Sequence, residues 1–305
     1  MSLRVFWWNV VFAVTVVAVA SHPGASFAQY LENNTVVSAP DSLVLGGKSP
    51  DYVAGIHFAK IKVFVHLIQD DNGSGGLSQS EVDSMLTVAG GHLFDLDIYV
   101  ELLGQDVIKN STYYSDPDAY YSNLFQENPH TDAIDIYLGP SQGPAKGRAS
   151  GIPGGALVLS GQLDSYSALS QLLGNCLGLY STDETLFGTE SHDGSNGHNA
   201  GDFIVDTPAD PGLEGYVDTN CNLTQAFQSS YPNHSPSVGN IMSNSRLECV
   251  NHFSQDQRNR VLAAVEYYQV LKDVVTSVPA SSYSDYTDGT KLMDYYTTVP
   301  ALLEQ

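Results

Sequence analysis

A helix predicted over residues 165–179, together with the turn after it, most constrains what this chain can fold into. The stretch includes Gln171, Leu172, Asn175 and Ser181. Gln171 and Asn175 are four residues apart, so their side chains lie on one face of the helix. Gly178 can adopt backbone conformations closed to other residues, so the chain can turn sharply after the helix. The stretch therefore predicts a helix with two amide side chains on one face, followed by a sharp turn.

Further motifs flank this helix in a fixed order. Upstream, residues 147–160 read GRASGIPGGALVLS. Downstream come GDFIVDTPADP over residues 201–211 and NIMSNS over residues 240–245. A segment ending in Cys249 follows, and then FSQDQ over residues 253–257. Several ordered motifs of this kind are strong support for a particular fold but weaker support for an activity.

The order and spacing of these motifs resemble the pappalysin-type metzincin metallopeptidases, whose helix reads HExGHxLGLYHT. The chain keeps six of those residues: Gly174, Leu177, Gly178, Leu179, Tyr180 and Thr182. The similarity covers residues 55–270. It implies an α+β, metzincin-like zinc-metalloprotease fold, with a mixed twisted sheet, an active-site-type helix, and a C-terminal helix after a Met-turn at Met242. Gly178 and Met242 are then structural residues.

The catalytic chemistry of the resembling family is missing from its positions. Gln171, Asn175 and Ser181 stand where the family has its three zinc-binding histidines, and Leu172 stands where it has the general base. Amide oxygens and a hydroxyl are poor zinc donors compared with imidazole, and leucine accepts no proton. Zinc is the cofactor that the resemblance implies, and these residues predict that it is not bound here.

Substitute ligands are the alternative. His192 and His198 lie six residues apart in a glycine-rich loop and are candidates to replace the missing histidines. The opposing interpretation is that both are solvated loop residues, because flexible spacing does not hold two imidazoles on one metal without other support.

Two segments are candidates for calcium. Residues 70–81 match the spacing of an EF-hand loop through Asp70, Asn72, Ser74 and Glu81. A strand precedes them, so the competing prediction is a strand-to-helix turn, with Ser78 capping the helix. The second segment carries an acidic set that the resemblance places near a calcium ion: Glu184, Glu190, Asp202 and Asp206. A solvated acidic loop is the alternative there.

Cysteine usage favours an oxidising compartment. Cys221 and Cys249 flank the segment that leads into the Met-turn, where the resembling family also has a disulfide, and we expect them to pair. Cys176 is then left over on the helix, and we expect a buried, unreactive thiol.

The ends of the chain predict export. Arg4, an apolar run over residues 10–20, and small residues before Gln29 are typical of a signal peptide over residues 1–28, cleaved near Ala28. We expect a flexible leader over residues 29–54, the peptidase-like domain over residues 55–275 and a tail over residues 276–305. The mature protein is expected outside the cytoplasm, secreted to the exterior or to a periplasm.

Partners follow from charge and from the sheet. A formal net charge of −22 repels nucleic acid and anionic membrane surfaces, so neither is expected as a partner.

Strands are predicted over residues 59–69, 94–102, 133–138 and 155–160, with His66 as a core or cross-strand residue of the first. Helices are predicted over residues 80–92 and 254–275. In the resembling family substrate peptides add to the sheet edge near residues 139–155, so a peptide or protein ligand is expected along that edge.

Three hypotheses for function remain open. The first is an exported pseudoprotease that binds an extended peptide or protein without cleaving it. The second is an active zinc metalloendopeptidase with substitute ligands. The third is a secreted structural protein ordered by calcium. No oligomeric state is predicted.

Overall fold

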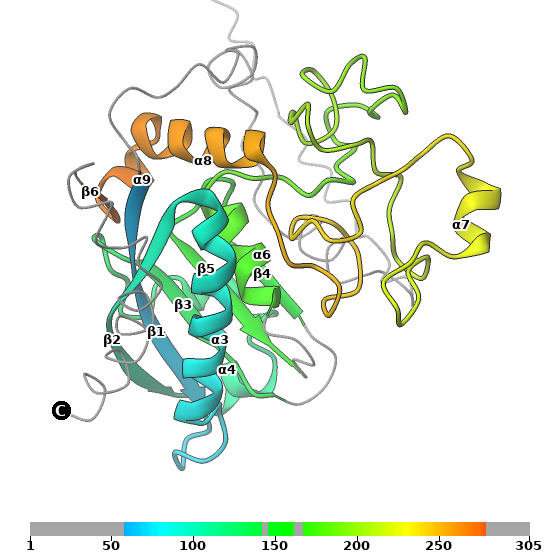
Figure 1. Ribbon diagram of the computed structural model, residues 1–305. Coiled ribbons are helices and arrows are strands. Elements are labelled where there is room, and N and C mark those ends of the chain that lie inside the picture. The colour runs from blue at the N-terminus through cyan, green and yellow to red at the C-terminus, as the bar shows by residue number, and fades with distance from the viewer. Residues whose placement is uncertain (1–57, 142–145, 162–166, 279–305) are drawn as a thin grey trace, which may run out of the picture.

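The computed structural model describes residues 58–141, 146–161 and 167–278 (Figure 1). The predicted signal peptide, the predicted leader and residues 279–305 of the predicted tail lie outside the described residues. None of the helices in the described ranges combines the length and apolar character needed to cross a bilayer.

A six-stranded mixed sheet forms the centre of the fold. Its strands run in the order β2 (Ile98–Lys109), β1 (Phe58–Gln69), β3 (Ile134–Leu138), β5 (Ala156–Ser160) and β4 (Lys146–Ala149). The pairs β1–β2, β1–β3 and β3–β5 are parallel, whereas β4 pairs with β5 in the antiparallel sense. The short strand β6 (Val275–Val278) pairs antiparallel with the first residues of β1. The strand β4 therefore ends the sheet on one side.

Side chains of β1 alternate between the two faces of the sheet, and apolar residues are buried on both. Ile61, Val63 and Val65 are fully buried in the main core together with α3 and α6. The intervening residues face the other side of the sheet, where Ile68 belongs to a second core cluster with Tyr137. Both faces of β1 are thus covered, and the predicted strand over residues 59–69 is confirmed.

Helices α3 (Gln79–Leu93) and α6 (Ser167–Cys176) pack on one face of the sheet (Figure 1). The short helices α4 (Ser111–Ser115) and α5 (Tyr121–Leu124) belong to the segment that covers the other face. Near the C-terminal end, α8 (Gln255–Tyr267) is followed by α9 (Gln269–Lys272). The predicted continuous helix over residues 254–275 is wrong at this point, because Tyr268 has extended backbone angles and separates the two helices.

The second strand also differs from its prediction. Residues Phe94–Leu96 form the 3₁₀ helix η1, and β2 then runs from Ile98 to Lys109 rather than over residues 94–102. Between the two elements Asp97 has a φ of 54°, a left-handed conformation that aspartate tolerates better than most residues. Its carboxylate is ion-paired with Arg258 of α8, so tertiary packing fixes the turn that a local pattern did not reveal.

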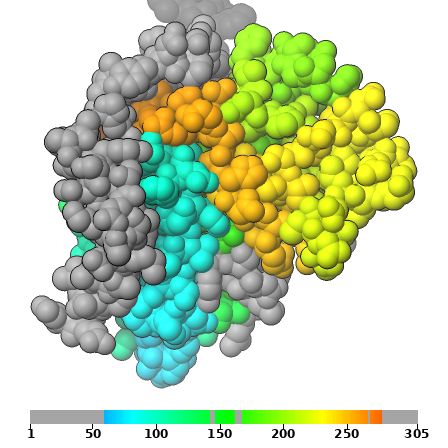
Figure 2. Space-filling view, viewed as in Figure 1, coloured from blue at the N-terminus to red at the C-terminus, as the bar shows by residue number. Residues whose placement is uncertain are grey.

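Residues 177–253 form a loop-rich lobe that contains α7 (Gln225–Ser230). Its yellow atoms gather on one side of the molecule, with the orange C-terminal segment between them and cyan α3 (Figure 2). The predicted disulfide is confirmed, since Cys221 and Cys249 are bonded. Cys249 also packs with Leu213, Val217 and Phe227 in a small core of the lobe. The disulfide and this core hold a segment with little regular structure.

Candidate functional site

The helix α6 presents its motif residues to the protein interior. Every residue of this helix is buried. The Gln171 amide nitrogen donates to the Ser243 carbonyl oxygen at 3.2 Å, and the Asn175 amide nitrogen donates to the Leu179 carbonyl oxygen at 3.0 Å. The two side chains therefore stabilise the Met-turn segment and the end of their own helix, rather than binding each other. Ser181 is also buried.

The remaining amide oxygens test whether this site suits zinc. Gln171 Oε1 and Asn175 Oδ1 are buried, and neither accepts a hydrogen bond from a described protein group. A buried oxygen without a hydrogen-bond donor destabilises the folded state, so both oxygens can still accept a hydrogen bond from a bound polar molecule. They are neutral oxygens, however, and zinc in proteins is held by imidazole, thiolate or carboxylate. The residues present do not fit the zinc ion of the resembling family.

Leu172, which the resemblance places at the general-base position, is a packing residue. It is fully buried and belongs to the main core. A Cβ atom built on Gly147 of β4 would lie 2.8 Å from Leu172 Cδ1. The side chain thus fills the contact between α6 and the last strand of the sheet, which is the place where a catalytic carboxylate would need access to water.

The architecture around these positions is intact. Gly178 ends the helical stretch with a φ of 96°, as its predicted turn role requires. A Cβ on Gly174 would lie 2.5 Å from Met242 Sδ, so Met242 packs directly against the helix. Asn240 accepts from the Met242 backbone N–H at 2.9 Å and exchanges hydrogen bonds with Gln257 of α8. The Met-turn therefore keeps its supports without the metal chemistry.

The proposed substitute ligands differ from the α6 positions in burial. His192 and His198 are both exposed. The ring of His192 lies 6.0 Å from that of His234, and His198 Nε2 is hydrogen-bonded to the amide of Asn199. Within the described ranges, the one group of three potential metal-binding residues is elsewhere and comprises His66, His130 and Asp135. Sequence reasoning assigned His66 to the core and singled out neither partner.

The acidic residues of the loop-rich lobe are only partly brought together. Burial, and then repulsion from Asp210, raises the pKa of both Asp183 and Glu190 to about 7. Burial also raises the pKa of Asp202 well above its ordinary value, and Glu190 contributes to this rise. Asp183 Oδ1 and Glu190 Oε1 are buried without a described hydrogen-bond partner. Carboxylates in such a setting are stabilised by a proton or by a cation.

Two of the predicted calcium candidates have other partners. Asp206 accepts from the Ser254 hydroxyl at 2.6 Å and from the Asp256 backbone N–H at 2.9 Å, so it stabilises the start of α8. Glu184 accepts from the backbone N–H of Leu186. Asp210, which the sequence prediction omitted, repels both Asp183 and Glu190 and so contributes to the raised pKa of each.

The loop over residues 70–81 forms the predicted strand-to-helix turn. Asp70 Oδ1 accepts from the backbone N–H groups of Asn72 and Ser74. Ser78 and Glu81 form a capping box at the start of α3. The carboxylate at the twelfth loop position therefore already has a structural role, and calcium binding by this loop stays a prediction.

The fold is similar to that of mirolysin from Tannerella forsythia, solved in complex with a cleaved peptide. That comparison has a TM-score of 0.50 and 16% sequence identity, and it covers 71% of this chain and 95% of mirolysin. A second mirolysin structure, in complex with compound 9, gives 17% identity over 71% of this chain and 96% of that one, with the same TM-score of 0.50. No protein-family model matches the chain, and no curated protein matches it.

The architecture places the chain in a structural class. A twisted, mostly parallel sheet with helices, similar to that of the metzincin metallopeptidase mirolysin, defines a metzincin-like α+β fold. At 16–17% identity this similarity establishes the fold alone.

Proposed function

We propose that this chain is a pappalysin-type metallopeptidase homologue that has lost catalysis and binds an extended peptide or protein segment. The supporting observation is that the side chains at the motif positions have structural roles. Gln171 and Asn175 donate to backbone carbonyls, and Leu172 is a fully buried packing residue against β4. A metallopeptidase needs those positions to hold a metal and to activate water.

The last strand of the sheet is the proposed binding surface. Among the described strands, β4 pairs only with β5. The Ser150 backbone N–H donates to Ala156 at 2.7 Å, so the alternation of an antiparallel pair directs the N–H of Ala149 away from β5. Such an N–H group can donate a hydrogen bond to a carbonyl oxygen of an added strand. Mirolysin was solved with a cleaved peptide, which supports peptide as the ligand class. Arg148 and Ala149 are buried, so an added strand must displace covering atoms, and we expect slow association.

A binding assay with a proline substitution tests this surface. Extended peptides from a random pool are selected on the purified chain, and affinity is measured by fluorescence polarisation. Ala149→Pro removes the outward N–H but leaves the β4–β5 hydrogen bonds, so affinity should fall, whereas the matched Ala149→Gly keeps the N–H and should bind. Equal binding by both variants would place the peptide elsewhere.

A digestion assay tests the absence of catalysis. The same peptides are incubated with the chain and added zinc, and products are followed by mass spectrometry. We expect no cleavage above a buffer control. Cleavage that disappears in His192→Gln/His198→Gln would instead support a metallopeptidase with substitute ligands.

Calcium ordering is the second candidate function, and a specific observation favours it. Asp183 and Glu190 each have a buried carboxylate oxygen without a described partner, and both have raised pKa values. A calcium ion takes oxygen ligands of this kind. The disulfide of the same lobe suits an exported protein. The test is the chelator experiment given in the Discussion.

A further inference from the structure

A second polar cluster lies on the face of the sheet opposite α6. His66 comes from β1, Asp106 from β2, Asp135 from β3, and His130 from the segment just before β3. The register places His66 beside Asp106 on one side and Phe64 beside Asp135 on the other. These side chains therefore share one face, and they pack with Tyr137 of the second core cluster rather than with the helices.

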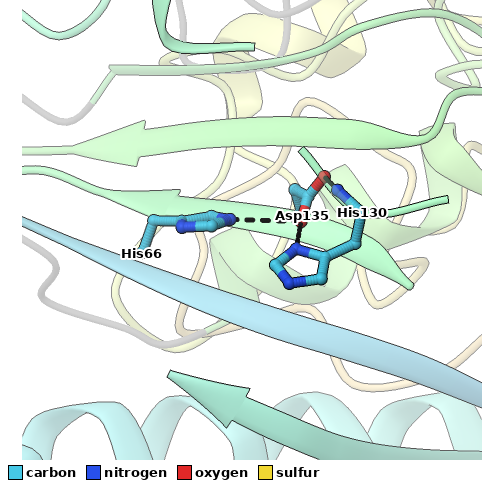
Figure 3. A group of neighbouring side chains, drawn as sticks. All are labelled: His66, His130 and Asp135. Carbon is cyan, nitrogen blue, oxygen red and sulfur yellow. Dashed lines mark hydrogen bonds and ion pairs between the residues drawn. The ribbon is translucent and has the colours of Figure 1, made fainter. Parts of the chain in front are cut away.

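A single carboxylate oxygen is the centre of this cluster (Figure 3). Asp135 Oδ1 lies 3.1 Å from His66 Nε2 and 2.7 Å from His130 Nδ1. Its other oxygen accepts from the His130 backbone N–H at 2.9 Å, which fixes the carboxylate orientation. One ligand atom from each of the three residues lies within 4.8 Å of the others. Zinc holds nitrogen and oxygen ligands at about 2.0–2.2 Å, which puts them about 3.3 Å apart, so small outward movements suffice to admit an ion.

The donor inventory of His66 points to a cation. His66 Nδ1 lies 2.7 Å from Asp106 Oδ1, while Nε2 faces Asp135 Oδ1. A neutral imidazole donates from one nitrogen only, so both carboxylates are satisfied either by a doubly protonated His66 or by a metal ion at one ring nitrogen. A metal ion between His66 Nε2 and Asp135 gives the second arrangement. The Nδ1–H then donates to Asp106, and the Nε2 lone pair binds the ion.

Asp106 has the position of an outer support for such an ion. Metal-binding histidines commonly donate their second ring N–H to a carboxylate that is itself hydrogen-bonded. Asp106 Oδ2 accepts from the Asn128 amide at 2.9 Å, which completes that arrangement. The ring planes are held as well, because Tyr137 stacks on His66 at 4.4 Å and Phe64 stacks on His130 at 3.9 Å.

Access and charge complete the site. His66 and Asp135 are buried, whereas the side chain of His130 is 29% exposed and gives an ion a route from solvent. Two imidazoles and one carboxylate suit divalent transition metals, and three protein ligands leave a position for water. An ion here would also cross-link β1, β3 and the segment before β3.

We propose that His66, His130 and Asp135 form a binding site for a divalent transition-metal ion such as zinc, with Asp106 as a positioning residue. This site is independent of the proposed loss of catalysis at α6. It also changes how zinc binding must be interpreted, because a zinc ion found on the purified chain would not by itself indicate a peptidase centre.

The test is a zinc titration of the purified full chain after removal of metal. Isothermal calorimetry gives the affinity, and native mass spectrometry gives the stoichiometry. We expect one zinc ion per chain in the wild type. Asp106→Asn should weaken binding about 10–100-fold, the range for outer supports of metal ligands, and His130→Gln should weaken it further.

The matched control is His192→Gln/His198→Gln, which removes two exposed histidines and should keep the wild-type affinity. Cobalt(II) supplies a second readout, since its visible absorption bands should form with the wild type and be lost in His130→Gln. Circular dichroism of the metal-free variants checks folding, and Asp106→Asn serves if His130→Gln does not fold. No zinc on the wild type, or zinc held equally by His130→Gln and Asp106→Asn, would overturn the proposal.

Discussion

Two polar clusters lie on opposite faces of one sheet, and they differ in what their atoms can bind. On the helix side, the polar side chains of Gln171, Asn175 and Ser181 carry neutral amide and hydroxyl groups only. On the other side, His66, His130 and Asp135 bring imidazole and carboxylate together without any recognisable motif. The comparison teaches that a motif resemblance and a set of metal-binding donor atoms can lie in different parts of one fold.

The difference also concerns packing. The α6 site is fully buried and tied to the Met-turn, so its residues stabilise the fold. The His66 cluster keeps one partly exposed histidine. The helix and the Met-turn have a packing role of their own, because both contribute residues to the main core.

The largest effect should come from returning the missing chemistry to α6. Gln171→His/Leu172→Glu/Asn175→His/Ser181→His introduces three imidazoles and a carboxylate, so we expect one zinc ion more than the wild type binds, and measurable peptide hydrolysis. The matched triple variant that keeps Leu172 should bind the same additional zinc ion but hydrolyse about 10²–10⁴-fold more slowly, because general-base catalysis is absent. The wild-type zinc stoichiometry in both variants would mean that the α6 site does not suit a metal.

Leu172 should behave as a core residue. Leu172→Ala creates a cavity between α6 and β4, so we expect a loss of about 2–5 kcal/mol in the free energy of unfolding. Leu103→Ala is the control, since Leu103 is 43% exposed and should change stability by no more than about 0.5 kcal/mol. Denaturant melts give both values. A loss below about 1 kcal/mol at Leu172 would contradict its packing role.

The acidic loop offers a third metal test. The folded state raises the pKa of Asp183 and Glu190 to about 7, so it binds more protons than the unfolded state between about pH 4 and pH 7. In chelator, stability should therefore fall as pH rises through that window. Calcium at 100 times its Kd should restore about 2.7 kcal/mol at pH 7.

Thermal melts at several pH values, with and without calcium, check this expectation. The control is a melt at pH 4, where protonated carboxyls leave calcium little to bind. A melting temperature that changes neither with pH nor with added calcium would contradict the calcium hypothesis for this lobe.

The smallest effect concerns the contact between α6 and the Met-turn. Gly174→Ala places a methyl group against Met242 Sδ, and overpacking of this kind costs about 1–3 kcal/mol. Gly91→Ala in α3 is the matched control, because nothing lies within 4 Å of its added Cβ. It should gain about 0.5–1 kcal/mol from helix propensity. Equal effects in the two melts would mean that Met242 does not support the helix.

Much of the fold was accessible from the sequence. The capping box at Ser78 and Glu81 and the turn at Gly178 follow from local residue chemistry, and the pairing of Cys221 with Cys249 follows from the family resemblance. All three are present. The start of β2 was not accessible, because Asp97 adopts its turn against Arg258 of α8, 161 residues away.

The sequence by itself determined that α6 lacks imidazole and carboxylate at its motif positions, since donor chemistry is a property of the residues. Only the tertiary structure decided that His66 meets Asp106 and Asp135, which are 40 and 69 residues distant along the chain. The physical reason is strand register. Parallel pairing of β1 with β2 and β3 sets which side chains share a face, and no local pattern fixes that register.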